Sequence, residues 1–129
     1  MRKRQRAWPP LTRLELRIMQ ILWEAGPLNV QAVQERLGDG LAYTTVQTML
    51  NVLDRKGHVA RELVGRAYSY RPLQNRETAR GGAVRDLLNR MFDGSADDLV
   101  MNMLEAKQIN PAKLEELIKR FEISQGELE

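Results

Sequence analysis

The chain has 129 residues, of which 43% are apolar and 29% charged, a balance typical of one or two small globular domains. It has no cysteine and a single histidine, His58, which removes disulfides, thiolate metal sites and most hydrolytic triads. Its glycines match no phosphate-binding loop, and no apolar run is long enough for a membrane span. We therefore expect a cytoplasmic protein that is not an enzyme, holds no cofactor or metal and does not enter a membrane.

Charge is divided unevenly along the chain. Residues 1–73 hold 12 Lys and Arg against 6 Asp and Glu, whereas residues 74–129 hold 8 against 11. A basic half favours a polyanion such as nucleic acid, although an unevenly charged solvated surface explains the numbers equally well. The first residues form a basic arm that either enters a minor groove or stays solvated. Its cations are Arg2, Lys3, Arg4 and Arg6.

Two short helices are predicted before residue 40. Thr12 and Glu15 have the spacing of a capping box, so the first helix should begin near residue 13 and end at Gly26. Asn29 can cap a second helix, which should end before Gly38. Apolar residues recur at helical spacing in both segments, which indicates that one side of each helix faces a core.

A third helix is predicted from Tyr43 to Lys56, with Gly57 as the left-handed residue after its end. One side is apolar, but the other carries uncharged hydrogen-bonding groups where a solvated helix normally has Glu and Lys. Such groups can read base edges in a major groove, since glutamine bonds adenine and a threonine methyl contacts the thymine methyl. A local alternative is a capping box of Thr44 and Gln47, with the helix starting one residue later. The predicted base-reading residues are Tyr43, Thr44, Thr45, Gln47, Thr48 and Asn51.

The pattern then changes to the period of a β-strand. The runs 59–64 and 67–71 flank Gly65 and Arg66, which predicts a hairpin closed by Pro72. Arginines on such a hairpin can contact the DNA backbone or a minor groove, or they simply keep an edge strand soluble. The predicted phosphate contacts are Arg55, Lys56, Arg61 and Arg66. Two helices, a polar-faced helix and a basic hairpin follow the order of a winged helix-turn-helix.

Three amphipathic helices are predicted in the C-terminal half, capped by Asn75, Ser95 and Asn110, and the last residues, 124–129, should fray. So short a set of helices buries little alone, because domains below about 40 to 60 residues are marginal. The helices therefore either pack on the winged domain or pair with a second copy of the chain. Their apolar stripes contain Val84, Leu87, Leu88, Met91, Leu99, Val100, Leu114, Leu117, Ile118 and Phe121.

Four segments carry a specific resemblance: 11–23, 43–57, 65–72 and 87–103. Together they resemble the penicillinase repressor family of BlaI and MecI type, over the chain from Leu11 to about Phe121. The recognition-helix signature of that family is matched by Thr45, Val46, Thr48, Leu50, Leu53, Lys56 and Gly57.

The resemblance implies a mainly α fold with a small β-hairpin wing. It implies a winged-helix DNA-binding domain over residues 1–73 and a three-helix dimerisation domain over 74–129, with the stripes listed above as the dimer contacts. A symmetric dimer places two third helices about one DNA turn, or a small multiple of it, apart, and so should bind an inverted repeat. Family members repress promoters, commonly of β-lactam resistance genes. Two alternatives remain open: a protein-interaction module, and a ligand-sensing regulator that is not controlled by proteolysis.

The resemblance also implies a mode of release. Several family members are inactivated when a membrane-bound sensor protease signals antibiotic and the repressor is cut in the helix after a turn like that at Gly94. The corresponding bond in this chain joins Asn102 to Met103, where family examples have phenylalanine after the asparagine. A cut there would remove the last apolar stripe from the dimer.

Overall fold

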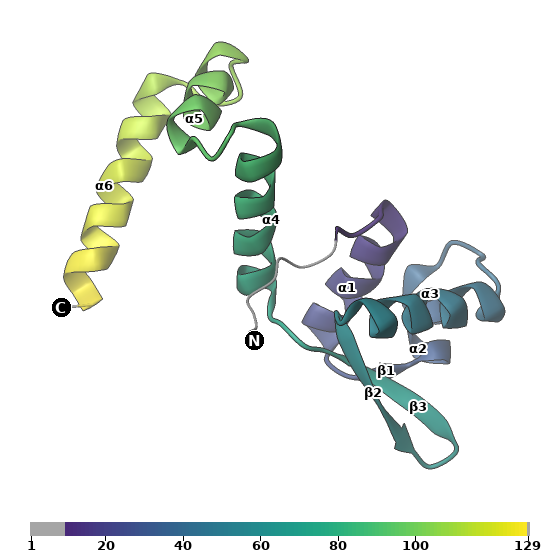
Figure 1. The fold of residues 1–129 in the computed structure, drawn as a ribbon. Helices are drawn as coiled ribbons and strands as arrows, with labels where there is room; N and C mark the ends of the chain where they lie inside the picture. The colour runs from purple at the N-terminus through teal and green to yellow at the C-terminus, as the bar shows by residue number, and fades with distance from the viewer. Residues whose placement is uncertain (1–9, 129) are drawn as a thin grey trace, which may run out of the picture. The chain divides into compact units, whose positions relative to one another are not determined.

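The computed structural model describes residues 10–128, and the predicted basic arm lies outside this range. The described part is mainly α with a small antiparallel sheet, as predicted (Figure 1). Its elements are α1 (Arg13–Ala25), β1 (Leu28–Asn29), α2 (Val30–Leu37), α3 (Tyr43–Lys56), β2 (Val59–Val64), β3 (Ala67–Pro72), α4 (Arg76–Met91), α5 (Ala96–Glu105) and α6 (Pro111–Leu128).

The chain divides into two compact units between Val84 and Arg85. The first unit holds the three N-terminal helices, the sheet and the start of α4, and the second holds the remainder. The division falls later than the predicted boundary after residue 73 and lies inside α4, whose first residues belong to the first unit. A folding boundary after residue 73 therefore stays a prediction.

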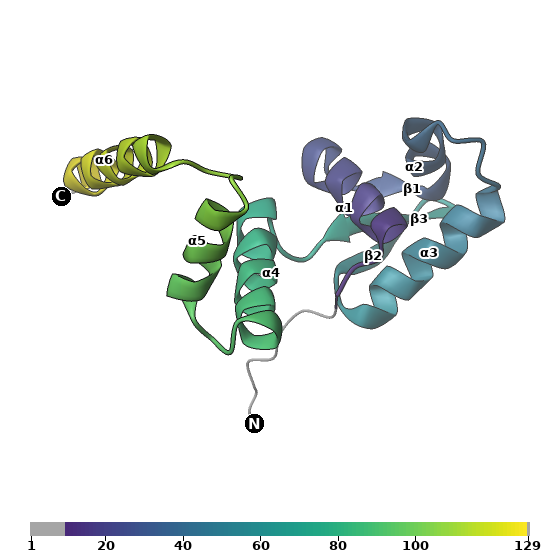
Figure 2. The same ribbon diagram turned by 90° about the horizontal axis from the view of Figure 1, so that it is seen from above.

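One apolar core joins the elements of the first unit. The inward sides of α1, α2 and α3 meet each other and one end of the hairpin, and these contacts exclude water from eleven apolar side chains. Figure 2 shows α1 running across the sheet beside α3. The buried residues are Ile18, Met19, Leu22, Val30, Val33, Leu37, Val46, Leu50, Leu53, Val59 and Tyr70.

Helix starts follow the predicted caps in five of the six helices of the described residues. The capping box of α1 is complete, because Glu15 N–H donates to Thr12 Oγ1 at 3.2 Å and Thr12 N–H donates to Glu15 Oε1 at 2.8 Å. The exception is α3, whose N-cap is Ala42, with no side-chain cap. The alternative capping box of Thr44 and Gln47 is therefore wrong.

The hairpin is confirmed, but it belongs to a three-stranded sheet of order β1-β3-β2. Val64 pairs with Ala67 around the turn, where Gly65 has a φ of 65°, a conformation that favours glycine. In β1, Leu28 pairs with Tyr70 of β3. This strand of two residues was not predicted, because it is too short to produce an alternating pattern. It joins the start of α2 to the wing.

The second unit has no buried side chain among its described residues, although several of them are large and apolar. α6 runs to Leu128, so the structure is helical beyond Ser124, and the expected fraying of these last residues stays a prediction. Within residues 10–128, no helix combines the length and apolar composition needed to cross a membrane.

Candidate nucleic-acid interface

The predicted base-reading residues all lie exposed on α3. Val46, Leu50 and Leu53 face the core from the opposite side of the same helix and fix its rotation. Thr44, Thr48, Asn51 and Arg55 follow one another at steps of four, three and four residues and so form one line along the helix. The polar face of α3, as we call it, consists of Tyr43, Thr44, Thr45, Gln47, Thr48, Asn51 and Arg55.

The start of α3 leaves its polar side chains free. The N-cap residue of α3 is Ala42, and no side chain caps the helix. Thr44 and Gln47 are therefore not used for capping. The first N–H groups of α3 are also without a side-chain partner, at the positive end of the helix dipole. This end of the helix is therefore suited to a phosphate as well as to base edges.

A cavity of about 180 Å³ separates the start of α3 from the wing. Tyr43 and Gln47 line it from α3, Arg66 lines it from the hairpin turn, and Gln31 lines it from α2. The fold thus places the turn arginine, Arg66, beside the start of α3. Gln31 was not predicted, because nothing in its local pattern separates it from an ordinary solvated helix residue.

Asn51 is held by the wing. The Tyr70 hydroxyl, on a side chain that is buried in the core, donates a hydrogen bond of 3.1 Å to Asn51 Oδ1. This bond uses the amide oxygen of Asn51 and leaves its NH₂ group for an acceptor on a base.

Replacing Tyr70 by phenylalanine should release Asn51 at small cost in stability. The lost hydrogen bond is worth about 1 kcal/mol, and the Asn51 oxygen lies at an exposed residue where water replaces the hydroxyl. If Asn51 contacts a base as predicted, we expect discrimination at that base to weaken, with binding to random duplex unchanged, as measured by titration with single-base operator variants. Equal discrimination by both proteins would contradict the positioning role of Tyr70.

The predicted phosphate contacts differ in their surroundings. Arg55 and Arg66 are exposed, and neither forms an ion pair within residues 10–128. Arg61 lies with its guanidinium carbon 4.3 Å from the centre of the Tyr68 ring, and its Nε lies 3.8 Å from Asp54 Oδ2 of α3. The charge of Arg61 is therefore partly compensated within the fold.

Lys56 was predicted to contact phosphate, but in the structure it forms an ion pair with Glu15 of α1. Its Nζ lies 2.9 Å and 3.0 Å from the two carboxylate oxygens of Glu15, a residue that is only 2% exposed. Burial by itself would raise the pKa of Glu15, but hydrogen bonds from the Thr12 backbone and from Lys56, with the charge of Lys56, lower the pKa overall. Lys56 thus joins the end of α3 to the capping box of α1.

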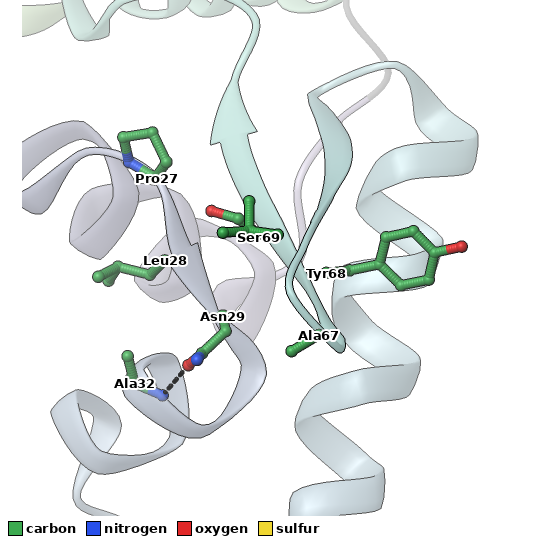
Figure 3. Close-up of a pocket in the computed structure, with 8 residues that line it drawn as sticks. Pro27, Leu28, Asn29, Ala32, Ala67, Tyr68 and Ser69 are labelled. Atoms are coloured by element: carbon green, nitrogen blue, oxygen red, sulfur yellow. Dashed lines mark hydrogen bonds between the residues drawn. The ribbon is translucent and has the colours of Figure 1, made fainter.

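A second cavity, of about 280 Å³, lies at the edge of the sheet where β1 meets β3. Figure 3 shows Asn29 turned back to accept a hydrogen bond from Ala32 N–H, at 2.8 Å, with Tyr68 directed away from Pro27 and Leu28. No charged side chain lines this cavity, so it differs in charge from the arginine-bearing part of the wing. Its lining residues are Pro27, Leu28, Asn29, Ala32, Val64, Ala67, Tyr68 and Ser69. Among the described residues there is also no group of three or more His, Asp or Glu side chains that could hold a metal ion.

The chain is similar in sequence to known transcriptional repressors and in structure to one DNA-binding domain. The chain is 28% identical over 116 residues to the penicillinase repressor of Bacillus licheniformis, covering 88% of this chain and 91% of that protein. It is 35% identical over 96 residues to the transcriptional regulator BlaI of Mycobacterium tuberculosis, covering 71% and 70% of the two chains. The solution structure of the DNA binding domain of the repressor BlaI matches with a TM-score of 0.50 and 27% identity, over 56% of this chain and 90% of that one.

The resemblance seen in the sequence is therefore confirmed, together with the winged-helix fold. The sequence profile of the family described as penicillinase repressor matches residues 11–123, which is nearly the whole described chain. Its members are transcriptional repressors rather than enzymes. The chain belongs to the penicillinase repressor family.

Proposed function

We propose that this protein is a cytoplasmic repressor that binds an inverted-repeat operator in double-stranded DNA as a homodimer. The observation that carries the proposal is the polar face of α3, which is exposed along its length, is uncharged in its first two turns and is not used for capping. A helix with that surface fits a major groove, where hydrogen-bonding groups and methyls distinguish the base pairs.

The roles within this interface follow from position. Thr44, Thr48 and Asn51 face the bases as one line, and Gln47 reaches them from the side next to the wing. Arg55 continues the same line at the C-terminal part of α3, where the groove wall carries phosphates, and Arg66 contacts the backbone from the wing. Arg61 contributes less, because Asp54 and Tyr68 already surround it.

The dimer is proposed from the uncovered apolar side chains of the second unit. Phe121 is 64% exposed and Ile118 is 49% exposed, and both belong to the stripe of α6 that the sequence predicts. In the second unit, Leu87, Met91 and Val100 are also exposed, and Leu88, Leu99, Leu114 and Leu117 are half-buried. Val84, the last residue of the first unit, is exposed as well. Met101 and Ile123 are further exposed apolar residues that were not predicted. Such an amount of uncovered apolar surface is typical of an interface.

A second copy of the chain is the proposed cover for this surface. Two equal copies paired about a twofold axis bury the same stripes on both sides. The same axis sets two α3 helices against the two halves of a palindrome. The regulated genes are proposed to include β-lactam resistance genes, as the names of the relatives suggest.

Release by proteolysis is the remaining part of the proposal. The bond between Asn102 and Met103 lies inside α5, and the Asn102 carbonyl accepts a hydrogen bond of 2.9 Å from Ala106 N–H in the last turn. A protease of a membrane sensor system would have to open this turn first, which is feasible near the end of a short helix. Incubation with membranes from induced cells, followed by mass analysis, tests it: an intact chain despite derepression would exclude the cut.

Gln47→Ala and Arg66→Ala should affect DNA binding differently. Gln47→Ala should reduce the preference for operator over random duplex by about 1–3 kcal/mol, because one base contact is lost. Arg66→Ala should weaken binding to all duplexes alike and reduce the slope of log affinity against log salt by about 0.9, as expected for one phosphate. Fluorescence titrations at several salt concentrations measure both quantities.

Arg120→Ala is the matched control, because it removes the same charge from α6 and should leave both quantities unchanged. Unaltered preference in Gln47→Ala together with an unaltered salt slope in Arg66→Ala would reject the interface. Equal affinity of the unmodified protein for all duplexes would indicate electrostatic binding without sequence preference. No binding at physiological salt would favour a protein-interaction module instead.

A further inference from the structure

A cavity of about 350 Å³ in the first unit is formed by α1, α2 and the first two turns of α4. It shares no residue with the polar face of α3 or with the wing. Its lining is dominated by guanidinium groups, because four of the seven lining residues are arginines. The lining residues are Arg17, Gln20, Ile21, Glu24, Arg36, Arg76 and Arg80.

Most of this charge has no acidic partner. Arg17 is paired with Asp39, and its Nη2 also donates to the Leu37 carbonyl at 3.2 Å. Arg36, Arg76 and Arg80 take part in none of the ion pairs or side-chain hydrogen bonds of residues 10–128, and Glu24 lies in the cavity without approaching any arginine to within 4.0 Å. Three uncompensated cations therefore line one concave surface.

The position of two of these arginines is unfavourable for the protein alone. Arg76 and Arg80 are four residues apart in the first turns of α4, so that like charges repel each other on one side of the helix. They also lie near the N-terminal end of the helix, where the dipole disfavours positive charge. A bound anion would remove both disadvantages.

The start of α4 is fixed against α1, which makes the cavity a defined site. The Trp23 indole N–H donates to the Gln74 carbonyl at 2.8 Å, immediately before the helix. Asn75 then caps the helix, accepting a hydrogen bond of 2.7 Å from Thr78 N–H. Arg76 and Arg80 are thereby held beside Arg17 and Arg36 rather than at the end of a loose segment.

We propose that this cavity binds a small anion with two or more phosphate groups. Guanidinium groups bind phosphate oxygens through paired hydrogen bonds, and three unpaired ones from two helices require a multivalent partner. The volume lies in the range of small-molecule sites, and its concave form suits a compact ligand better than a DNA strand. The amide of Gln20 adds a hydrogen-bond donor to the site.

Pyrophosphate is the probe for the full-length protein, in titration calorimetry and thermal unfolding at constant ionic strength. The double substitution Arg76→Gln and Arg80→Gln should weaken pyrophosphate binding at least tenfold, because charge-assisted hydrogen bonds are lost. Without pyrophosphate the same variant should melt about 2–4 °C higher than the unmodified protein, because the repulsion in α4 is removed. A purely solvated arginine surface would show the same rise in melting temperature, so the loss of pyrophosphate affinity is the result that decides.

The control exchanges Arg85 and Arg120 for glutamine, which removes the same charge from outside the cavity and should keep the pyrophosphate affinity. Equal pyrophosphate affinities of the two double variants would overturn the proposal. So would the absence of pyrophosphate binding to the unmodified protein. Malonate binding as strong as pyrophosphate binding would overturn the assignment to phosphate groups. Displacement of pyrophosphate by a random DNA duplex would show that the cavity contacts the DNA backbone. That result would overturn the assignment to a small ligand.

Discussion

Phe121→Asp should convert the protein into a monomer and abolish tight operator binding. The Phe121 side chain is 64% exposed in a single chain, so its replacement removes little from the fold of one copy. In the proposed dimer each ring contributes about 1.5–3 kcal/mol of burial, and two copies are affected. The dimer dissociation constant should therefore rise by roughly 10²–10⁴-fold, and more where the new charge is buried.

Sedimentation velocity measures the dimer, and a gel shift with a palindromic operator measures binding. The matched control is Lys119→Gln, which changes the net charge by the same amount on the other side of α6 and should leave both results unchanged. If Phe121→Asp sediments as a dimer of unaltered affinity, the stripe of α6 is not the dimer interface. If it is monomeric but still binds the whole operator as tightly, the twofold reading of a palindrome is wrong.

Lys56→Met should cause the largest loss of stability among substitutions at charged residues of the first unit. It leaves the Glu15 carboxylate buried without its partner. Breaking a buried ion pair in this way costs about 3 kcal/mol, which corresponds to a melting temperature roughly 10–20 °C lower for a domain of this size. Thermal unfolding followed by circular dichroism measures the difference. A melting temperature within about 2 °C of the unmodified protein would mean that the pair does not hold α3 against α1.

The effect should depend on pH with a defined sign. Because the pKa of Glu15 is lowered in the folded protein, its ionised form favours folding. The contribution of the pair is therefore complete above the ordinary pKa of a glutamate and is lost as the pH falls through the lowered value. The difference between Lys56→Met and the unmodified protein should be largest near pH 7 and should shrink below about pH 4.

Adding Glu15→Gln provides the control for this interpretation. The amide removes the unpaired buried charge, and its oxygen still accepts from Thr12 N–H in the capping box. The double variant should therefore regain most of the stability that Lys56→Met loses, without the dependence on acid pH. A double variant as unstable as Lys56→Met would show that the loss arises from packing of the lysine side chain.

The candidate interface divides into a local part and a non-local part. The span of α3 and its polar side were predictable, because the apolar residues Val46, Leu50 and Leu53 recur at helical spacing and Gly57 marks the end. The surroundings of the side chains were not predictable. Lys56 was expected to contact phosphate but pairs with Glu15, 41 residues earlier, and Asn51 receives its hydrogen bond from Tyr70, 19 residues later.

The amino-acid order alone determined where most helices begin and end, since caps and periodicity act within a few residues. Only the tertiary structure decided which charged side chains are paired within the fold and which are left without an ion pair. It paired β1 with β3, and it placed Lys56 and Arg61 in ion pairs with Glu15 and Asp54. It also brought arginines from three helices together in one cavity. Contacts between residues far apart in sequence set these outcomes, because burial and Coulomb interactions depend on distance in space and leave no periodic trace along the chain.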